Sequence, residues 1–228
     1  MSHWSDTLAV FDTETTGLST RDDRIVTAFL GVMGPDGELT ESFSWLADPG
    51  FVIPPRATEV HGITTKMAQE QGRPAAEVVA EVLRELTRLL GAGIPLVVYN
   101  ASYDLCLTNS EAKRYGLQPL DNPRPIIDPL VIDRALDTYR KGKRTLDVVS
   151  MHYGIINDNA HNAEGDAVTA GRVARAIAQK FPEETADVMS LHDRQVDWAY
   201  QWAESFKRYL ESQGLPARGL GGRWPLDE

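Results

Sequence analysis

Two acidic side chains follow the first apolar segment of the chain and could together bind a metal ion. Asp12 and Glu14 come directly after residues 8–11, an apolar run typical of a buried strand. Residues i and i+2 of a strand point to the same face, so the two carboxylates should lie side by side. Such a pair is unfavourable unless a cation neutralises it, and Mg²⁺ or Mn²⁺ prefers oxygen ligands. The plainer alternative is a strand that ends in a polar turn, and this motif alone does not decide.

Two further acidic motifs follow at a distance. Asp104 ends the polar segment 100–104, which comes after a second apolar run, and His161 precedes Asp166 by five residues where a helix should begin. Taken alone, His161 would be a surface loop histidine and Asp166 an acid favoured by the helix dipole. The three motifs together instead predict that several chemical groups converge on one site.

In this order, the motifs resemble those of the DnaQ-like (DEDDh) family of 3′–5′ exonucleases, which includes the proofreading ε subunit of bacterial DNA polymerase III. The resemblance covers about residues 7–180. It implies an α/β, ribonuclease-H-like fold with a mixed β-sheet flanked by helices. It also implies a metal-dependent 3′–5′ exonuclease that releases nucleoside monophosphates, with DNA as the favoured substrate.

The resemblance further implies the catalytic roles. Two Mg²⁺ or Mn²⁺ ions per site would assist phosphodiester hydrolysis, and His161 would be the general base, because an imidazole can accept a proton near neutral pH. Asp12 would bridge the two ions. The full set of implied metal ligands is Asp12, Glu14, Asp104 and Asp166.

A second set of residues is expected, by the same resemblance, to bind the terminal nucleotide of a single-stranded 3′ end. This set comprises Thr15, Gly17, Leu18, His61, Asn100 and Tyr103. Some of them have plainer explanations: Gly17 as a turn glycine, His61 in capping or loop packing, and Tyr103 in the core.

Composition limits the kind of partner. The net charge of −10 argues against tight, sequence-blind coating of DNA, but not against a metal-assisted grip on one chain end. Residues 140–144 form a basic run that could grip the strand upstream of the cleaved end, or could be a solvated loop.

Cys106 is the single cysteine, and no apolar run is long enough to span a membrane. With no signal-peptide pattern at residues 1–6, we expect no membrane contact and a cytoplasmic location.

Periodicity and turn signals predict an antiparallel meander of three strands, followed by alternating helices and strands. The Pro-rich segment 48–62 is expected to be a loop. The predicted strands cover residues 7–11, 25–32, 38–46, 96–99 and 126–127. The predicted helices cover residues 74–90, 103–115, 130–138, 145–153 and 166–181.

Three regions follow from this pattern: an exonuclease domain at 1–181, an aromatic-rich helix at 182–213 and a flexible tail at 214–228. The helix should pack on the domain, because so many rings need a partner surface. The alternative is an interface with a second copy of the chain or with a DNA polymerase.

Two other functions are compatible with the motifs. The substrate could be RNA or short oligonucleotides, since contacts to the 2′-hydroxyl cannot be identified from one sequence. The chain could also be a catalytically inactive polymerase accessory or scaffold module. The five intact catalytic positions count against that reading.

Overall fold

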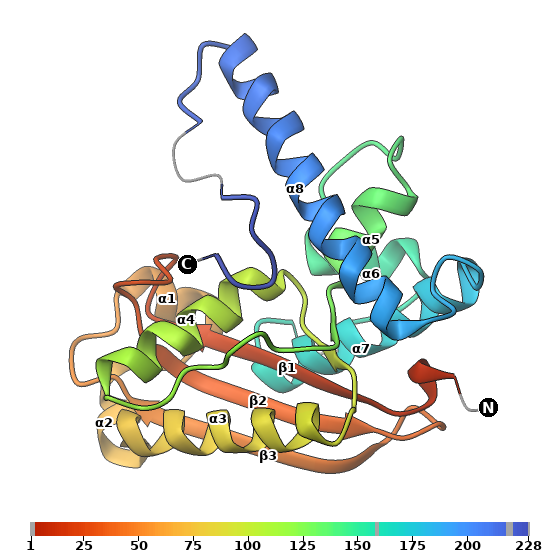
Figure 1. Ribbon diagram of the computed structural model, residues 1–228. Helices are drawn as coiled ribbons and strands as arrows, with labels where there is room; N and C mark the ends of the chain where they lie inside the picture. The colour runs from red at the N-terminus through yellow and green to blue at the C-terminus, as the bar shows by residue number, and fades with distance from the viewer. Residues whose placement is uncertain (1–2, 158–159, 218–220, 228) are drawn as a thin grey trace.

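The computed structural model describes residues 3–157, 160–217 and 221–227 (Figure 1). Its centre is a six-stranded mixed sheet in the order β4-β3-β2-β1-β5-β6. The first three strands form the expected antiparallel meander, and the three short strands pair in parallel with their neighbours. The α/β, ribonuclease-H-like prediction is therefore confirmed. The strands are β1 (Leu8–Thr15), β2 (Ile25–Met33), β3 (Leu39–Asp48), β4 (Arg73–Pro74), β5 (Leu96–Val97) and β6 (Ile126–Ile127).

Strand β1 is longer than the sequence predicted. Its pairing with β2 continues past Phe11, with Asp12 opposite Phe29 and Glu14 opposite Thr27. The polar side chains do not end the strand, because backbone hydrogen bonds to β2 are available whatever the side chain is. Asp12 and Glu14 therefore stand within the strand, on a rigid part of the sheet.

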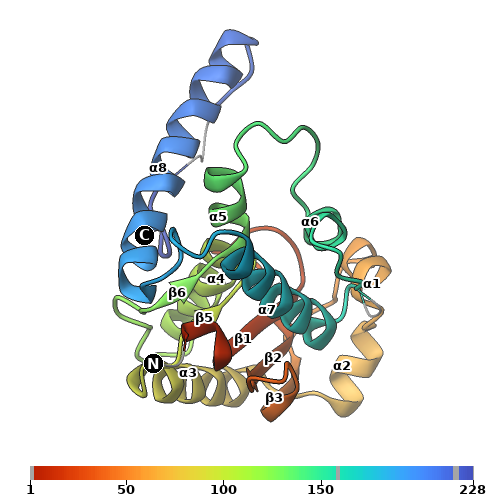
Figure 2. The same ribbon diagram turned by 90° about the vertical axis from the view of Figure 1, so that its right-hand side faces the viewer.

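Helices cover both faces of the sheet (Figure 2). On one face α3 (Ala75–Gly91) and α4 (Ala101–Arg114) pack against a core that includes Phe11. On the other face α7 (Ala163–Lys180) packs against a core that includes Val10. Because side chains alternate along β1, Asp12 and Glu14 point toward the α7 face and Thr13 toward the α4 face.

A close approach of α7 to β1 depends on one glycine. A Cβ built on Gly171 would lie 2.5 Å from the sulfur of Met33 and 2.6 Å from Cγ1 of Val10. A larger residue would push the helix away from the sheet. Gly171 thus helps to hold the first turn of α7, which carries Asp166, beside the end of β1.

Two short helices interrupt the segment between β3 and α3. These are α1 (Pro55–His61) and α2 (Thr65–Gln71), with Pro55 at the start of α1 and Gly62, in the left-handed conformation, at its end. The prediction that residues 48–62 form only a loop was wrong, because proline at the first helical position favours a helix. The remaining helices are η1 (Trp4–Asp6), α5 (Pro129–Leu136), α6 (Leu146–His152) and α8 (Val188–Ser212).

The first half of α8 covers the edge of the sheet at β6. Its buried His192 accepts a hydrogen bond from the Ile126 amide at 3.1 Å, and Gln195 donates to the Ile126 carbonyl at 3.0 Å and accepts from the Asp128 amide at 2.7 Å. These side chains replace the missing neighbouring strand. The second half of the helix extends away from the sheet (Figures 1 and 2).

Helix α8 begins later than predicted. Pro182 is not its first residue. The helix starts at Val188, where the Asp187 side chain accepts a hydrogen bond from the Ser190 amide at 2.7 Å. None of the helices in the described part of the chain is both long and apolar enough to cross a membrane.

Residues 221–227 pack against the domain. Trp224 is only 6% exposed, and its indole donates to Oδ2 of Asp128 at 3.3 Å. The Asp227 amide donates to the sulfur of Cys106, on α4. These contacts do not agree with the expected flexible tail, since the indole fills a place in the core that the sequence pattern does not reveal. The other tail residues include 218–220 and 228, which lie outside the described residues.

Candidate active site

Three of the predicted carboxylates meet where β1 ends beside the first turn of α7. Asp12, Glu14 and Asp166 each offer an oxygen, and the three oxygens lie within 4.8 Å of one another. Asp12 and Glu14 share one face of β1, and Asp166 comes from the helix packed on that face. The structure thus brings together two motifs that are separated by most of the chain.

These carboxylates raise one another's pKa values. Burial, followed by repulsion from Asp104, Glu14 and Asp166, holds the pKa of Asp12 well above its usual range. Burial and the charges of Asp166 and Asp104 raise the pKa of Glu14 to about 7. A divalent cation would relieve both causes, because it replaces lost solvation and cancels the repulsion.

Asp104 approaches the cluster from the opposite side of the sheet. It is buried, and its Oδ1 accepts hydrogen bonds from the amide of Thr13 at 3.1 Å and from the hydroxyl at 2.6 Å. Burial raises the pKa of Asp104 to about 7, although the Thr13 hydrogen bonds oppose the rise. Its carboxylate is not one of the three that lie within 4.8 Å, and both hydrogen bonds from Thr13 go to Oδ1.

The loop before α7 positions Asp166. The Asn157 side chain donates to Oδ1 of Asp166 at 2.8 Å, and the His161 amide donates to Oδ2 at 3.2 Å. Burial raises the pKa of Asp166, and these two hydrogen bonds oppose the rise. The helix begins at Ala163, three residues earlier than predicted, because Asn162 caps it.

His161 is exposed and has a left-handed backbone conformation, with φ at 65°. For a residue other than glycine this costs on the order of 1 kcal/mol. The conformation directs the His161 amide onto Asp166 and keeps the histidine beside the carboxylates. Asn157, by contrast, was not found by sequence reasoning, since an asparagine in a loop carries no motif of its own.

Three of the expected nucleotide contacts form one hydrogen-bonded group. The Tyr103 hydroxyl donates to the Gly17 carbonyl and shares a hydrogen bond of 2.6 Å with the Thr15 hydroxyl. Gly17 is required by a close approach, because a Cβ there would lie 2.6 Å from the Asp23 carboxylate. Leu18, which follows Gly17 in the chain, is 86% exposed and offers an apolar surface.

His61 ends α1 close to the same group. Its Nδ1 accepts a hydrogen bond from the Ile63 amide at 3.1 Å. Its Nε2 is buried and has no hydrogen-bond partner among the described residues. Burial lowers the pKa of this imidazole, an effect that the nearby Thr15 carbonyl partly offsets. A buried polar atom without a partner is unfavourable, which suggests a place for a ligand group.

Asn100 is separate from this group. It has a left-handed conformation at the start of α4, with φ at 62°, and its amide donates to Asp128 at 3.0 Å. Asp128 also accepts from the Ala101 and Leu130 amides, so it ties α4 to the start of α5. Sequence reasoning missed Asp128, although an aspartate between an apolar pair and a proline is a helix-start signal.

The basic run splits into two kinds of residue. Arg140 and Arg144 both pair with the fully buried Asp133 and are themselves largely buried, so they stabilise the turn after α5. Lys141 and Lys143 are exposed. The idea that the whole run grips a strand was therefore wrong for the two arginines.

Comparison with known proteins places this arrangement in a family. The family model RNase_T, described as Exonuclease, matches residues 9–174. The chain is 33% identical over 190 residues to the PolC-type DNA polymerase III of Clostridium perfringens, and 30% identical over 212 residues to that of Listeria welshimeri. These matches cover 83% and 91% of this chain but 12% and 14% of the two polymerases.

Solved structures show the same fold. Escherichia coli exonuclease I in complex with a dT13 oligonucleotide aligns with a TM-score of 0.65 at 21% identity, over 78% of this chain and 42% of that one. Exonuclease I from Methylocaldum szegediense aligns with a TM-score of 0.66 at 21% identity, over 87% and 45%.

Proposed function

The chain belongs to the RNase_T exonuclease family, and we propose that it is a metal-dependent enzyme that removes nucleoside monophosphates from the 3′ end of single-stranded DNA. This family membership confirms the resemblance to DnaQ-like exonucleases that the three acidic motifs indicated. The observation that supports the proposal most directly is the group formed by Asp12, Glu14 and Asp166, whose oxygens lie within 4.8 Å of one another.

This group fits divalent cations such as Mg²⁺ or Mn²⁺. It supplies only oxygen ligands, and burial with mutual repulsion raises the pKa values of its members. Asp104 would contribute through Oδ2, because Thr13 occupies only Oδ1. When bound, a pair of such ions stabilises the charge of the attacked phosphate and the leaving oxygen.

His161 is the proposed general base. Its backbone is fixed to Asp166, and its side chain is exposed beside the carboxylates, where it could take a proton from the attacking water. The loop that carries it is held further by Asn157. Positioning by the loop would determine how well the imidazole and the reacting phosphate align.

The terminal nucleotide would lie against the first loop and α1. Leu18 offers an exposed apolar surface for the base, and Nε2 of His61 offers a hydrogen bond to a sugar or phosphate oxygen. Tyr103 and Thr15 fix the Gly17 carbonyl, which shapes this part of the site. If the first loop closes the far side of the site, only the end of a nucleic-acid strand can make these contacts.

Proofreading of DNA synthesis is the role that the relatives favour. The relatives are named PolC-type DNA polymerase III, and this chain spans only 12% of the Clostridium perfringens protein and 14% of the Listeria welshimeri protein. A function together with a polymerase, acting on a displaced single-stranded end, is therefore part of the proposal. We also propose a cytoplasmic location, because the relatives described above are DNA polymerases.

The test uses single strands labelled at the 5′ end, incubated with the purified protein in Mg²⁺, in Mn²⁺ or in EDTA. We expect a ladder that shortens from the 3′ end only with a metal, and faster cleavage of DNA than of RNA. Asp12→Asn should be inactive in both metals. A ladder in EDTA, an active Asp12→Asn variant, or release of the 5′ label as a mononucleotide would each contradict the proposal.

A further inference from the structure

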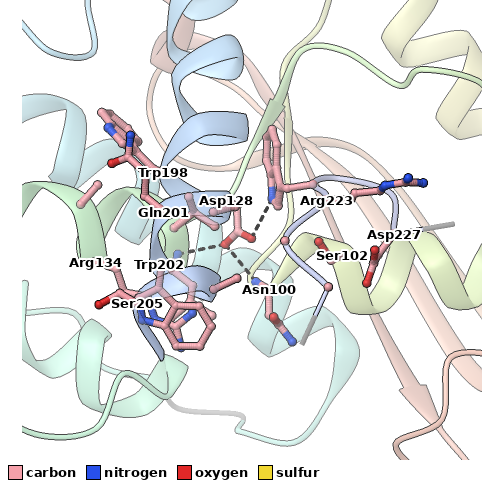
Figure 3. Close-up of a pocket in the computed structure, with 18 of the residues that line it drawn as sticks. Asn100, Ser102, Asp128, Arg134, Trp198, Gln201, Trp202, Ser205, Arg223 and Asp227 are labelled. Carbon is pink, nitrogen blue, oxygen red and sulfur yellow. Dashed lines mark hydrogen bonds between the residues drawn. The ribbon is translucent and has the colours of Figure 1, made fainter. Parts of the chain in front are cut away.

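A cavity of about 560 Å³ lies between α5, the middle of α8 and residues 221–227 (Figure 3). The family match ends at residue 174, so α8 and the tail that wall this cavity lie outside it. None of the carboxylates proposed as metal ligands lines the cavity. It is thus a second recess, built partly from segments that the family match does not include.

The cavity contains a cation held in a fixed position. The Arg134 guanidinium lies 3.8 Å from the ring centre of Trp202, which stacks in turn on Phe206 at 5.0 Å. The Arg134 guanidinium makes no hydrogen bond or ion pair with the residues that the structure describes. Burial lowers the pKa of Arg134, and the charge of Asp128 partly offsets this. Stacking leaves the hydrogen-bonding edges of a guanidinium open to an anion.

The acidic residues of the cavity do not neutralise Arg134 by contact. The Asp128 carboxylate already accepts hydrogen bonds from the amides of Asn100, Ala101 and Leu130 and from the Trp224 indole. Asp227 lies across the cavity, on the side of Arg223, whereas Arg134 and Trp202 lie together on the other side (Figure 3). A phosphate group would give Arg134 the charged partner that it lacks.

The cavity reaches the start of the helix that carries a catalytic carboxylate. Asn100 and Ser102 line it, and Tyr103 and Asp104 follow directly in α4. Ser102 and Asp104 are about 3 Å apart along the helix axis, given the rise per residue. The cavity wall and the Asp104 carboxylate therefore share the first turn of α4.

We propose that this cavity is a subsite for the single strand on the 5′ side of the scissile bond, where Arg134 binds a backbone phosphate and an unpaired base lies against Trp198. The inference rests on the proposed exonuclease function and adds to it a place where the upstream strand is held. Indole rings accept any base, which suits an enzyme that must act on any sequence. Trp198 also lines the cavity, next to Ala199 and Gln201.

The test compares a substrate that has only a terminal nucleotide with one that has an upstream strand. The first is p-nitrophenyl thymidine 5′-monophosphate, and the second is a 5′-labelled dT12. Arg134→Met removes the charge and keeps the bulk. We expect kcat and KM on the nitrophenyl ester to be unchanged and KM on dT12 to be about tenfold higher. The slope of the logarithm of dT12 affinity against the logarithm of salt concentration should become smaller by about one.

Two further variants keep the result interpretable. Arg88→Met is the matched control, because Arg88 also lies over an aromatic ring, 6.0 Å from the ring centre of Phe43, but does not line the cavity and does not contact Trp198. It should behave as wild type. Ser205→Glu places a negative charge on the exposed cavity wall without removing a packing contact, and should weaken dT12 binding as Arg134→Met does.

The outcomes separate the two hypotheses. Wild-type protein that hydrolyses neither substrate would contradict the exonuclease function, and dT12 binding measured by fluorescence anisotropy would still test the cavity. Equal binding of dT12 by wild type and Arg134→Met would overturn the subsite. So would equal losses on both substrates, which would assign Arg134 to the terminal nucleotide, or the same loss in Arg88→Met.

Discussion

Thr13 holds Asp104 by two hydrogen bonds to the same oxygen, one from its amide at 3.1 Å and one from its hydroxyl at 2.6 Å. The residues are 91 positions apart in sequence, and Thr13 stands between Asp12 and Glu14 on the opposite face of β1. The residue between the two acids of the first motif therefore fixes the acid of the second motif. This is possible because side chains alternate along a strand: Asp12 and Glu14 face α7, and Thr13 between them faces α4.

We expect Thr13→Val to lower activity about 10- to 100-fold, as is usual when a group that orients a metal ligand is lost. Raising the Mg²⁺ concentration should restore part of the rate, since the ligand is still present. Thr108→Val is the matched control: Thr108 is also buried near Asp104, but its hydroxyl donates to the Asp104 backbone carbonyl, not to the carboxylate. Equal Mg²⁺ dependence in the two variants would show that Thr13 has no orienting role.

Activity should depend on pH and Mg²⁺ together. Burial and neighbouring charges raise the pKa values of Glu14 and Asp104 to about 7, so protons compete with the metal near neutral pH. At limiting Mg²⁺ the rate should rise through about pH 7, and at saturating Mg²⁺ the midpoint should move to lower pH. The check is a series of pH profiles at several Mg²⁺ concentrations. A midpoint that does not change with Mg²⁺ would rule out this competition.

The stability of the metal-free protein should fall as the pH rises toward neutrality. The folded protein has raised pKa values at Asp12, Glu14 and Asp104, so between about pH 4.5 and 7 it binds more protons than the unfolded chain. The free energy of unfolding therefore decreases across this window, and the contribution of Glu14 and Asp104 is lost as the pH rises through their folded pKa values of about 7. Asp12→Asn removes one acidic group from the cluster and should be more stable than wild type at pH 8, where the neighbouring carboxylates are ionised.

Urea unfolding in EDTA at pH 5.5 and pH 8 measures this effect, and comparison of the two proteins separates the cluster from all other titrating groups. Added Mg²⁺ should stabilise wild type at pH 8 and have a smaller effect on Asp12→Asn. If the difference between the proteins were the same at both pH values, repulsion within the cluster would not limit stability.

The sequence predicted the parts of the fold that depend on local pattern. The meander, the helix over residues 75–91 and the short strand at Ile126–Ile127 all follow from apolar periodicity and turn residues. The convergence of Asp12, Glu14 and Asp166 followed from motif order. Thr13 and Asn157 could not be found in this way, because their roles depend on which distant carboxylate the fold brings next to them.

The C-terminal region was harder to predict for a similar reason. Aromatic density indicated that α8 must contact something, but not which residues do so. Alongside the apolar Leu191, the buried residues of the first half are the polar His192 and Gln195, which bind the backbone of β6. Several aromatic side chains remain exposed, including Tyr200 at 58% and Tyr209 at 57%. Polar residues that complete a sheet edge carry no periodic signal.

The packed tail gives the last expectation. Trp224 is 6% exposed, lies 5.1 Å from the His192 ring and donates to Asp128, which in turn holds the start of α4. Trp224→Ala should therefore reduce the free energy of unfolding by about 3 kcal/mol. Trp224→Phe keeps most of the packing and loses the hydrogen bond, so it should cost about 1 kcal/mol. Tyr139→Ala is the control, because that ring is 96% exposed and its removal should change little. Thermal melts of the three variants decide the matter: if Trp224→Ala melts like Tyr139→Ala, the tail does not stabilise the domain in solution.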